Sequence, residues 1–370
     1  MKVVFRADAS LQIGTGHVMR CLTLADALGA QGVDCQFICR KHQGNLIGLI
    51  GSKGYTVHTL PTQVEFLGAS SFVAKATGDE QAPAHIHWLG VTQEQDAEAC
   101  IPILAQLRPD WLIVDHYALD AQWELALKPH YQQLMVIDDL ADRQHHCDLL
   151  LDQTFGRDAD DYQNRVPADC RLLCGSQYAL LRPEFSKRRS YSLERRATPE
   201  LRSLLITMGG VDKDNITGRI LKALEVCPLP ARCQITVVMG MSAPWLEDVS
   251  QQAKSMSWPT RVMAGVRDMA QIMADSDLAI GAAGATSWER CCLGLPTVML
   301  VLANNQRAIA QALYSAGAAH LVDVNTLGEK KLLTRQQIGP NVLSAMSAFA
   351  ATVTDGLGTP EVITFLNRQG

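Results

Sequence analysis

The chain opens with the stretch that decides its fold, KVVFRADASLQIGTGHVMRCLTLADAL at residues 2–28. The apolar run at residues 2–6 has the length of a strand, and apolar residues recur at helical spacing from residue 16 to residue 28. The loop between these segments contains two glycines and follows the carboxyl end of the strand. A strand, a glycine-containing loop and a helix in this order indicate an α/β protein.

The alternation of short apolar runs with longer helical segments continues along the chain and predicts two Rossmann-like domains. The predicted strands of the first half are residues 2–6, 35–39, 56–60, 111–114, 134–137, 149–151 and 171–174. Those of the second half are residues 203–207, 234–239, 260–263, 278–280, 297–301 and 320–322, with helices beginning near Asp214, Met269, Thr286 and Gln306. Two parallel sheets covered by helices predict a crevice between the domains, where a small molecule would bind.

The domain boundary is predicted within residues 183–201, which are charged and contain almost no apolar run. A chain of 370 residues has the length of two domains, and we expect them at residues 1–185 and 200–370. A segment at residues 64–93 has no clear period and is interpreted as an insert. Within it, the motif at residues 87–91, HWLGV, is too specific for a simple spacer.

Composition and charge limit the class of protein. Apolar residues make up 47% of the chain and the net charge is −5, which is typical of a globular protein. The only basic cluster, at residues 187–196, is short and is interpreted as a solvated linker, so we expect no nucleic-acid partner. Because the sequence shows neither an export signal nor about 20 consecutive apolar residues, we expect a cytoplasmic protein with no membrane partner. We also expect a monomer.

The cysteines predict neither disulfides nor a metal site. Eleven cysteines are an odd number, scattered through apolar stretches, which indicates reduced thiols in the core. The run His145-His146-Cys147, with Cys170 and Cys174 further on, lacks the paired spacing of zinc ligands. It predicts a turn before a buried strand, with both histidines exposed or lining the crevice. We expect no metal and no cofactor.

The first loop does not match a phosphate-binding motif. A dinucleotide fingerprint would need a third glycine where this sequence has Met19, and the Gly-Lys-Ser/Thr of a P-loop is absent. We therefore interpret Gly14 and Gly16 as residues that let the backbone turn tightly and leave room for a substrate.

His17 lies at the first turn of the predicted helix. The positive end of the helix dipole disfavours a protonated imidazole there, so His17 would stay neutral and could act as a general base. The alternative is that His17 caps the helix or binds the loop backbone, with Asp8 and Ser10 as ordinary turn residues. The pattern leaves both interpretations open.

A second cluster, Asp115-His116-Tyr117, ends a predicted buried strand. The carboxylate could orient His17 or a water, and the two rings could line a sugar pocket. Alternatively, Asp115 closes the strand and caps the next helix. Asp138 and Asp139 follow a strand in the same way and leave the same alternatives.

Two strand–loop–helix segments of the second half are candidate phosphate sites. Gly209 and Gly210 follow one strand, and unbonded amides at such a turn favour an anion. The segment from Gly284 to Glu289 follows another strand. Its small residues let a diphosphate approach the amides, Thr286 and Ser287 offer hydroxyl groups, and Glu289 is placed to accept hydrogen bonds from a ribose. The alternative is a small-residue helix that simply packs against the sheet.

These motifs together resemble the UDP-2,4-diacetamido-2,4,6-trideoxy-β-L-altropyranose hydrolases of pseudaminic acid biosynthesis, over nearly the whole chain. The resemblance implies a GT-B fold, uracil bound near Val266, ribose bound by Glu289, and His17 as the base. The expected catalytic residues are His17, Asp115 and Tyr117. The expected substrate-binding residues are Asp8, Ser10, Gly14, Gly16, Arg20, His116, Gly209, Gly210, Asp212, Asn215, Val266, Gly284, Ala285, Thr286, Ser287, Glu289, Asn305 and Gln306.

The reaction that this resemblance implies is attack of water on the anomeric carbon with inversion, giving UDP and the free sugar without a metal. A UDP-sugar glycosyltransferase, a UDP-sugar 2-epimerase and a non-catalytic nucleotide-sugar sensor are the alternatives. A glycosyltransferase would need an acceptor surface, and the N-terminal half shows no basic and apolar cluster of that kind.

Overall fold

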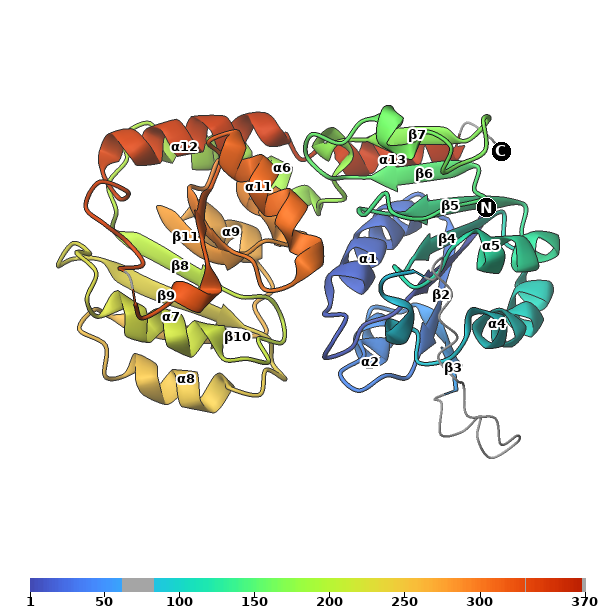
Figure 1. Cartoon of the computed structure of the whole chain (residues 1–370), viewed down its shortest axis with the longest axis horizontal. Helices are drawn as coiled ribbons and strands as arrows, with labels where there is room; N and C mark the ends of the chain where they lie inside the picture. Colours follow the sequence, from blue (N-terminus) through green and yellow to red (C-terminus); the bar gives the residue numbers. More distant parts are fainter. Residues whose placement is uncertain (62–82, 330, 368–370) are drawn as a thin grey trace. The chain divides into compact units, whose positions relative to one another are not determined.

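The structure is a computed structural model that describes residues 1–61, 83–329 and 331–367. The chain forms two compact units (Figure 1). One comprises Met1–Tyr178 together with Pro360–Gly370, and the other comprises Ala179–Thr359. Most of the predicted insert at residues 64–93 lies outside the described residues.

The N-terminal unit contains a seven-stranded parallel sheet in the order β3-β2-β1-β4-β5-β6-β7. All seven predicted strands are confirmed. Their bounds are β1 Lys2–Ala7, β2 Asp34–Arg40, β3 Thr56–Leu60, β4 Trp111–Asp115, β5 Gln133–Ile137, β6 Leu149–Asp152 and β7 Arg171–Cys174.

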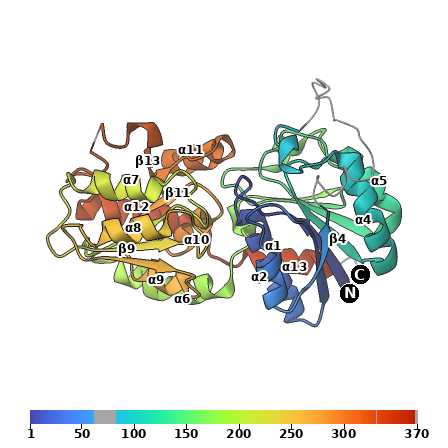
Figure 2. The same cartoon turned by 90° about the horizontal axis from the view of Figure 1, so that it is seen from below.

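Helices cover both faces of this sheet (Figures 1 and 2). One face carries α1 Gly16–Gly29, α2 Ile47–Ser52 and the last helix of the chain, α13 Gly358–Asn367. The other carries α4 Gln93–Leu107 and α5 Ala121–Leu127. The 3₁₀ turns are η1 Ile86–Trp88, η2 Lys128–His130, η3 Ala159–Tyr162 and η4 Ser176–Tyr178.

Alternation along the strands builds the core of this unit. Val4, Leu112 and Val114 point to one face, where they belong to the same buried cluster as Leu104 of α4 and Trp123 of α5. On the other face Phe5 stacks on Phe37 with ring centroids 4.9 Å apart. Because both faces are buried, the strands read as continuous apolar runs, which is why the sequence reveals them.

The C-terminal unit contains a six-stranded parallel sheet in the order β10-β9-β8-β11-β12-β13. Every predicted strand is again confirmed. The bounds are β8 Ser203–Thr207, β9 Gln234–Met239, β10 Thr260–Ala264, β11 Leu278–Ala282, β12 Thr297–Leu300 and β13 His320–Val322.

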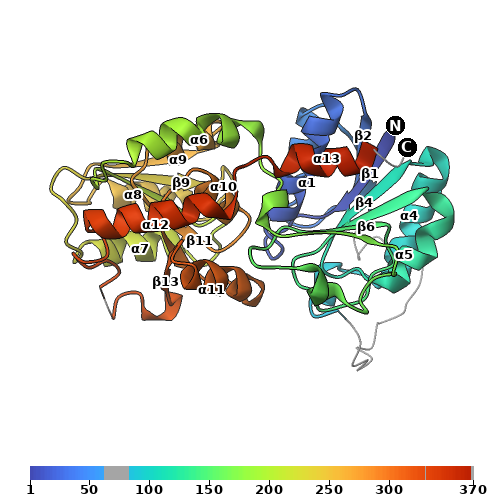
Figure 3. The ribbon, with the colours of Figure 1, turned by 90° about the horizontal axis from the view of Figure 1, so that it is seen from above.

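The helices of this unit also lie on two faces (Figures 2 and 3). One face carries α7 Ile216–Leu224 and α8 Leu246–Ala253. The other carries α6 Pro183–Arg195, α9 Met269–Ala274, α10 Thr286–Cys292 and α12 Pro340–Val353. The remaining elements are α11 Arg307–Ser315, which packs beside β13, η5 Asn304–Gln306 and η6 Val324–Thr326.

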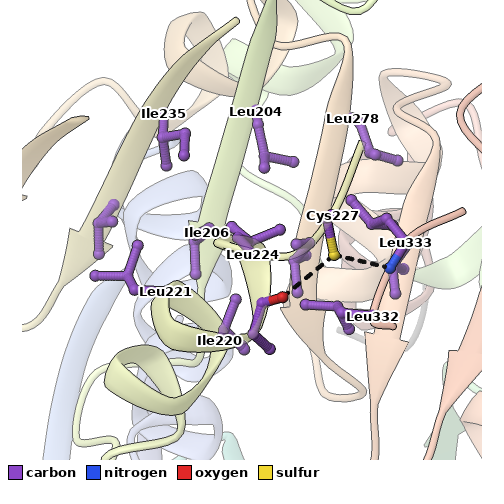
Figure 4. Close-up of a cluster of buried hydrophobic side chains, with 14 of the residues drawn as sticks. Leu204, Ile206, Ile220, Leu221, Leu224, Cys227, Ile235, Leu278, Leu332 and Leu333 are labelled. Carbon is purple, nitrogen blue, oxygen red and sulfur yellow. Dashed lines mark hydrogen bonds between the residues drawn. The ribbon is translucent and has the colours of Figure 1, made fainter. Parts of the chain in front are cut away.

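A large apolar cluster fills the space between α7 and the sheet (Figure 4). Leu204, Ile206 and Ile235 project from β8 and β9 toward Ile220 and Leu224 of α7. Cys227, at the end of this helix segment, donates to the Ala223 carbonyl and accepts a hydrogen bond from the Leu333 amide. The Cys227 thiol therefore has a structural role. All eleven cysteines among the described residues are free thiols, and most of them are buried.

The interpretation of the basic cluster at residues 187–196 as a solvated linker is wrong. Residues 183–195 form α6, whose Phe185 and Ser192 are buried against the C-terminal unit. The basic cluster is not solvated either, because Arg196 is buried and donates to the carbonyls of Met273, Ala274 and Ser276.

The domain boundary therefore differs from the predicted one. The C-terminal unit begins at Ala179, and the chain returns to the N-terminal unit at Pro360. Helix α13 is attached to the N-terminal sheet, because Trp111 of β4 donates its indole N–H to the carbonyl of Leu366 in α13 at 3.2 Å. The crevice between the two halves stays a prediction. Among the described residues no helix is long and apolar enough to cross a membrane.

Candidate active site

The expected site residues cluster at the topological switch point of each sheet. In the N-terminal unit, β2 and β3 continue to one side of β1 while β4 to β7 continue to the other. In the C-terminal unit the same reversal occurs between β8 and β11. Ligands of open parallel sheets bind outside the carboxyl ends of the strands at such points. The loops after β1, β4, β8 and β11 are therefore the places to look for chemistry.

His17 and Asp115 meet at the first of these switch points. His17 is the second residue of α1, which follows the loop after β1, and Asp115 is the last residue of β4. The His17 Nδ1 atom lies 2.5 Å from Asp115 Oδ1, and both residues are buried. The prediction that this carboxylate lies beside His17 is confirmed.

Arg20 holds the other side of this carboxylate. It lies one turn after His17 on α1, and its Nε and Nη2 donate to the two Asp115 oxygens at 2.6 and 2.7 Å. Its Nη1 donates to Asp139 at 2.5 Å, and Tyr117 donates to the same Asp139 oxygen at 2.7 Å. Arg20 was expected to bind substrate, but its guanidinium is occupied by two protein carboxylates and positions Asp115.

The contact with Asp115 selects the tautomer of His17. Burial alone would raise the pKa of Asp115, but the charges and hydrogen bonds of Arg20 and His17 outweigh it, so the pKa lies well below its usual range. An ionised Asp115 accepts a hydrogen bond from His17 Nδ1–H, which leaves Nε2 of the imidazole as the proton acceptor. Nε2 forms no hydrogen bond with a described residue. His17 therefore has the tautomer of a general base.

Aromatic rings surround His17. Tyr117 packs edge-on against the imidazole with ring centroids 4.5 Å apart, and Trp88 lies 6.4 Å away at 81°. Trp88 in turn lies near Tyr117, at 5.9 Å and 26°, and against His85, at 4.2 Å. The HWLGV motif thus contributes directly to the surroundings of His17. Sequence reasoning missed His85, which precedes that motif and belongs to no recognised pattern.

A buried ion-pair network supports the loop after β1. Arg6 Nη1 lies 2.7 Å from Asp8, and Arg6 also donates to Asp96 at 2.7 and 3.2 Å. Arg40 donates to Asp96 at 2.6 Å, and Asp8 accepts the Arg40 backbone N–H at 2.7 Å. Asp8 is thus part of the scaffold and not the ordinary turn residue of the alternative interpretation. Sequence reasoning missed Asp96 and Arg40, because nothing in a single sequence pairs residues so far apart.

Ser10 is a turn residue, as the alternative interpretation had it. Its hydroxyl accepts the backbone N–H groups of Gln12 and Ile13 at 3.1 and 2.9 Å. Ser10 and Gly14 form an isolated antiparallel bridge, and the φ of +80° at Gly14 favours glycine there. This turn leads directly to Gly16, the first residue of α1.

His116 and His42 approach Asp8 but do not form a metal site. Their Nε2 atoms lie 3.3 and 3.6 Å from Asp8 Oδ2. His116 Nδ1 accepts the Ala118 N–H at 3.1 Å, so in the neutral ring Nε2 carries the proton and faces the carboxylate. Among the described residues no group of His, Cys, Asp and Glu side chains is arranged to hold a metal ion.

The first switch-point loop of the C-terminal unit is closed by its own side chains. Asp212 accepts the N–H groups of Ile216 and Thr217 at 2.8 and 2.9 Å, and Asn215 accepts that of Gly218 at 3.0 Å. Asp212 and Asn215 thus cap the amides that begin this helix, and the anion site at the turn of Gly209 and Gly210 stays a prediction. Gly209 and Gly210 lie in the preceding loop.

In the second loop of this unit, by contrast, the backbone amides at the start of the helix have no side-chain cap. Residues 283–285, here called the Gly284 loop, connect β11 to α10. The amides of Gly284, Ala285 and Thr286 donate no hydrogen bond to any described residue, and α10 lacks a side-chain cap. Ser287 was expected to offer its hydroxyl to substrate, but it is fully buried and accepts a hydrogen bond from Arg290 at 3.2 Å.

Glu289 and Gln306 flank the Gly284 loop. The Glu289 side chain is 18% exposed and lies 3.8 Å from Arg182; burial raises its pKa although Arg182 opposes this. Gln306 accepts the Leu302 N–H at 2.9 Å, and its Nε2 lies 4.0 Å from the position of a Cβ atom on Gly284. Asn305 of the same turn has a buried Oδ1 without a partner among the described residues. Val266 lies apart from them, two residues after β10.

The prediction for His145 is wrong. It is buried with its Nδ1 2.6 Å from Glu124, and the His146 backbone N–H donates to the same carboxylate. Cys147 lies with its sulfur 3.6 Å from that of Cys170. A charged partner supplied by α5 buries a histidine that the sequence alone places on the surface.

The chain is similar in sequence to several known proteins. The family model described as the glycosyltransferase family 28 C-terminal domain matches residues 203–347. A UDP-2,4-diacetamido-2,4,6-trideoxy-β-L-altropyranose hydrolase from Campylobacter jejuni is 27% identical over 317 residues, which cover 86% of this chain and 97% of that protein. The chain is therefore similar to this hydrolase over most of its length. Another relative in sequence, the spore coat polysaccharide biosynthesis protein SpsG of Bacillus subtilis, is 27% identical over 47% of this chain and 50% of its own length.

Similarity to solved structures shows that this chain has the GT-B fold. MurG of Acinetobacter baumannii superposes with a TM-score of 0.68 at 18% identity, covering 99% of each chain. The UDP-GlcNAc 2-epimerase of Neisseria meningitidis superposes with a TM-score of 0.55 at 13% identity over the full length of both chains. The predicted fold class, two Rossmann-like α/β domains of GT-B type, is confirmed.

Proposed function

We propose that this protein hydrolyses a UDP-sugar, with His17 as the general base that activates water. The observation that carries the proposal is the contact of His17 Nδ1 with Asp115 at 2.5 Å. That contact directs the basic Nε2 away from the carboxylate, and the bidentate contacts of Arg20 keep Asp115 ionised and immobile. A pair of this kind orients an imidazole and stabilises it once it has taken a proton.

In the proposed step the oxygen of water attacks the anomeric carbon, and His17 Nε2 takes the proton of that water. The bond between the anomeric carbon and the phosphate oxygen breaks, and its electron pair leaves with UDP. The attack occurs opposite to the leaving group, so the configuration at the anomeric carbon inverts. In this scheme Tyr117 contacts the imidazole that activates the water.

The proposed site for the diphosphate is the Gly284 loop. Its three unbonded amides and small side chains suit a group that carries negative charge and needs close approach of the backbone. Glu289 would accept hydrogen bonds from the ribose, and Val266 would lie at the uracil. Asn305, Gln306, Gly209 and Gly210 complete the proposed binding residues. The N-terminal unit thus supplies the base and the C-terminal unit holds UDP.

For the sugar we propose 2,4-diacetamido-2,4,6-trideoxy-β-L-altropyranose. The support is the similarity to the Campylobacter jejuni hydrolase, which extends over 97% of that protein. The proposal places this protein in pseudaminic acid biosynthesis, in the cytoplasm, with no requirement for a metal.

The test is incubation of the purified protein with this UDP-sugar and water, with UDP and the sugar followed by NMR. We expect UDP and the free sugar in equal amounts, without an acceptor and with EDTA present. UDP release only on addition of an acceptor would indicate a glycosyltransferase, and a changed configuration at C2 an epimerase. Binding of the UDP-sugar without any turnover would leave only the sensor.

The role of His17 is tested with His17→Asn. We expect turnover to fall below detection while UDP binding, measured by calorimetry, stays within about twofold, because this substitution removes the proton acceptor and not the nucleotide site. His130→Asn is the control. His130 precedes β5 and so lies at the amino ends of the strands, whereas His17 follows the carboxyl end of β1. Near-normal turnover in His17→Asn would remove His17 from the role of base.

A further inference from the structure

Arg290 lies buried beneath the Gly284 loop. It is 1% exposed, and its guanidinium donates to the Ala282 carbonyl at 2.8 Å and to the hydroxyls of Thr286 and Ser287 at 3.2 Å each. These three partners come from the end of β11 and the start of α10. One side chain therefore connects the two ends of the Gly284 loop from below.

The backbone of β11 leaves room for this guanidinium. A Cβ atom on Gly281 would lie 2.5 Å from Arg290 Nη1 and 3.3 Å from the Thr207 carbonyl oxygen. Any side chain at residue 281 would therefore displace the guanidinium. The φ of Gly281 is not in the left-handed region, so the space for Arg290 is the physical reason for glycine there.

The charge of neighbouring Glu289 acts on Arg290, but it does not form an ion pair with the guanidinium. Among the described residues no carboxylate forms an ion pair with it, and its Nε has no partner. The buried arginines 6, 20, 40 and 143 of the N-terminal unit each pair with an aspartate. Burial lowers the pKa of Arg290 to about 10, which leaves it charged at neutral pH. A buried charge without a counter-charge is costly unless something else offsets it.

Arg196 shows what offsets a buried arginine elsewhere in the same unit. Burial also lowers its pKa to about 10, but it donates to the carbonyls of Ser192, Met273, Ala274 and Ser276. Three of these belong to the end of α9 and the turn after it, where unpaired carbonyls carry partial negative charge. Arg290 has only one carbonyl among its partners.

We propose that Arg290 is a positioning residue for the diphosphate of UDP, holding the Gly284 loop in its open shape and placing beneath it a buried positive charge that has no ion-pair partner among the described residues. The inference rests on the proposed function, in which this loop takes the diphosphate. Arg290 does not touch the ligand in this proposal. It acts through the amides of Gly284, Ala285 and Thr286, which it keeps free of internal partners, and through its charge.

The test compares UDP with uridine, which has the base and ribose of UDP but no phosphate. In Arg290→Gln we expect the affinity for UDP to fall by about tenfold or more and that for uridine to change by less than about twofold, as measured by calorimetry and competition. Arg290→Lys keeps the charge, and we expect it to recover most of the affinity for UDP. Arg196→Gln is the matched control, because it removes another buried arginine that lies just before the amino end of β8, away from the Gly284 loop.

Gly281→Ala provides a second route if Arg290→Gln does not fold. It leaves the charge in the protein but moves the guanidinium, and we expect the same selective loss of UDP over uridine. An equal loss of both ligands, or an unchanged affinity for UDP in a folded variant, would overturn the proposal. Failure of the unmodified protein to bind UDP would instead refute the proposed function, and this inference with it.

Discussion

Asp115 controls which nitrogen of His17 carries the proton, so the smallest informative change is Asp115→Asn. An asparagine amide can donate to Nδ1 and thereby move the imidazole proton to Nε2, where it blocks the base. We expect kcat to fall by about a thousandfold or more while UDP affinity is nearly unchanged. Turnover and UDP calorimetry on the same preparation measure both quantities.

The matched variant is Asp139→Asn. It removes the second partner of Arg20 and the acceptor of Tyr117, but it leaves the contact between His17 and Asp115 in place. A decrease in kcat far smaller than that of Asp115→Asn is expected. Equal effects of the two substitutions would mean that the carboxylates act through Arg20 alone and not through the tautomer of His17.

At the scale of single residues, the sequence predicts which residues belong to the candidate site but not which role each of them has. His17 and Asp115 follow from their places after two apolar runs. The role of Arg20 does not, because its three contacts depend on strands β4 and β5 meeting α1. Ser287 illustrates the same limit. It is buried, and Arg290, one turn further along α10, donates a hydrogen bond to its hydroxyl.

The contrast between α7 and α10 belongs to the scale of elements. Helix α7 begins with amides that Asp212 and Asn215 satisfy, whereas α10 begins with amides that have no partner among the described residues. Both follow a strand and a glycine-containing loop, so the sequence presents them as equivalent anion sites. Only the positions of the capping side chains distinguish them.

This contrast predicts a local effect of Asp212→Ala. Loss of the cap costs about 1 kcal/mol, and hydrogen exchange at Ile216 and Thr217 should therefore accelerate about fivefold. Asp214→Ala is the control, because Asp214 is exposed and accepts no hydrogen bond from the helix. Unchanged exchange at both amides in Asp212→Ala would show that this cap does not stabilise α7.

Helix α6 marks the limit of prediction from periodicity. Strands β8 and β9 have the predicted bounds because strands buried on both faces are continuously apolar. Helix α6 packs with charged residues instead, since Arg189 donates to the carbonyls of Cys292, Ala351 and Thr354. A helix attached by arginines to backbone carbonyls leaves no apolar pattern in the sequence.

For the whole molecule, the C-terminal unit is an insertion between β7 and α13 of the N-terminal unit. Its two ends lie together, because Thr359 near the exit donates to the carbonyl of Leu181 near the entry at 2.9 Å. The two-domain organisation was predictable from length and alternation. The return of the chain was not, since the apolar residues of α13 would suit either sheet.

This arrangement predicts that the two units can be separated. Residues 179–359 should fold alone, and residues 1–178 joined to 360–370 by a short glycine linker should form a cooperative unit, as judged by thermal unfolding and NMR dispersion. Residues 1–178 without α13 are the control, because they leave Trp111 without its acceptor and uncover the face on which Val362 and Leu366 are buried. Equal stability with and without α13 would contradict the prediction.

The contact between Trp111 and Leu366 spans 255 residues of sequence, which bears on the order in which the protein is made and folded. The ribosome completes all seven strands of the N-terminal sheet by residue 174, but α13, which covers part of one face, is synthesised only after the inserted unit. The inserted unit has its final strand by residue 322 and α12 by residue 353. The N-terminal sheet can therefore gain α13 only after the ribosome has synthesised the whole inserted unit.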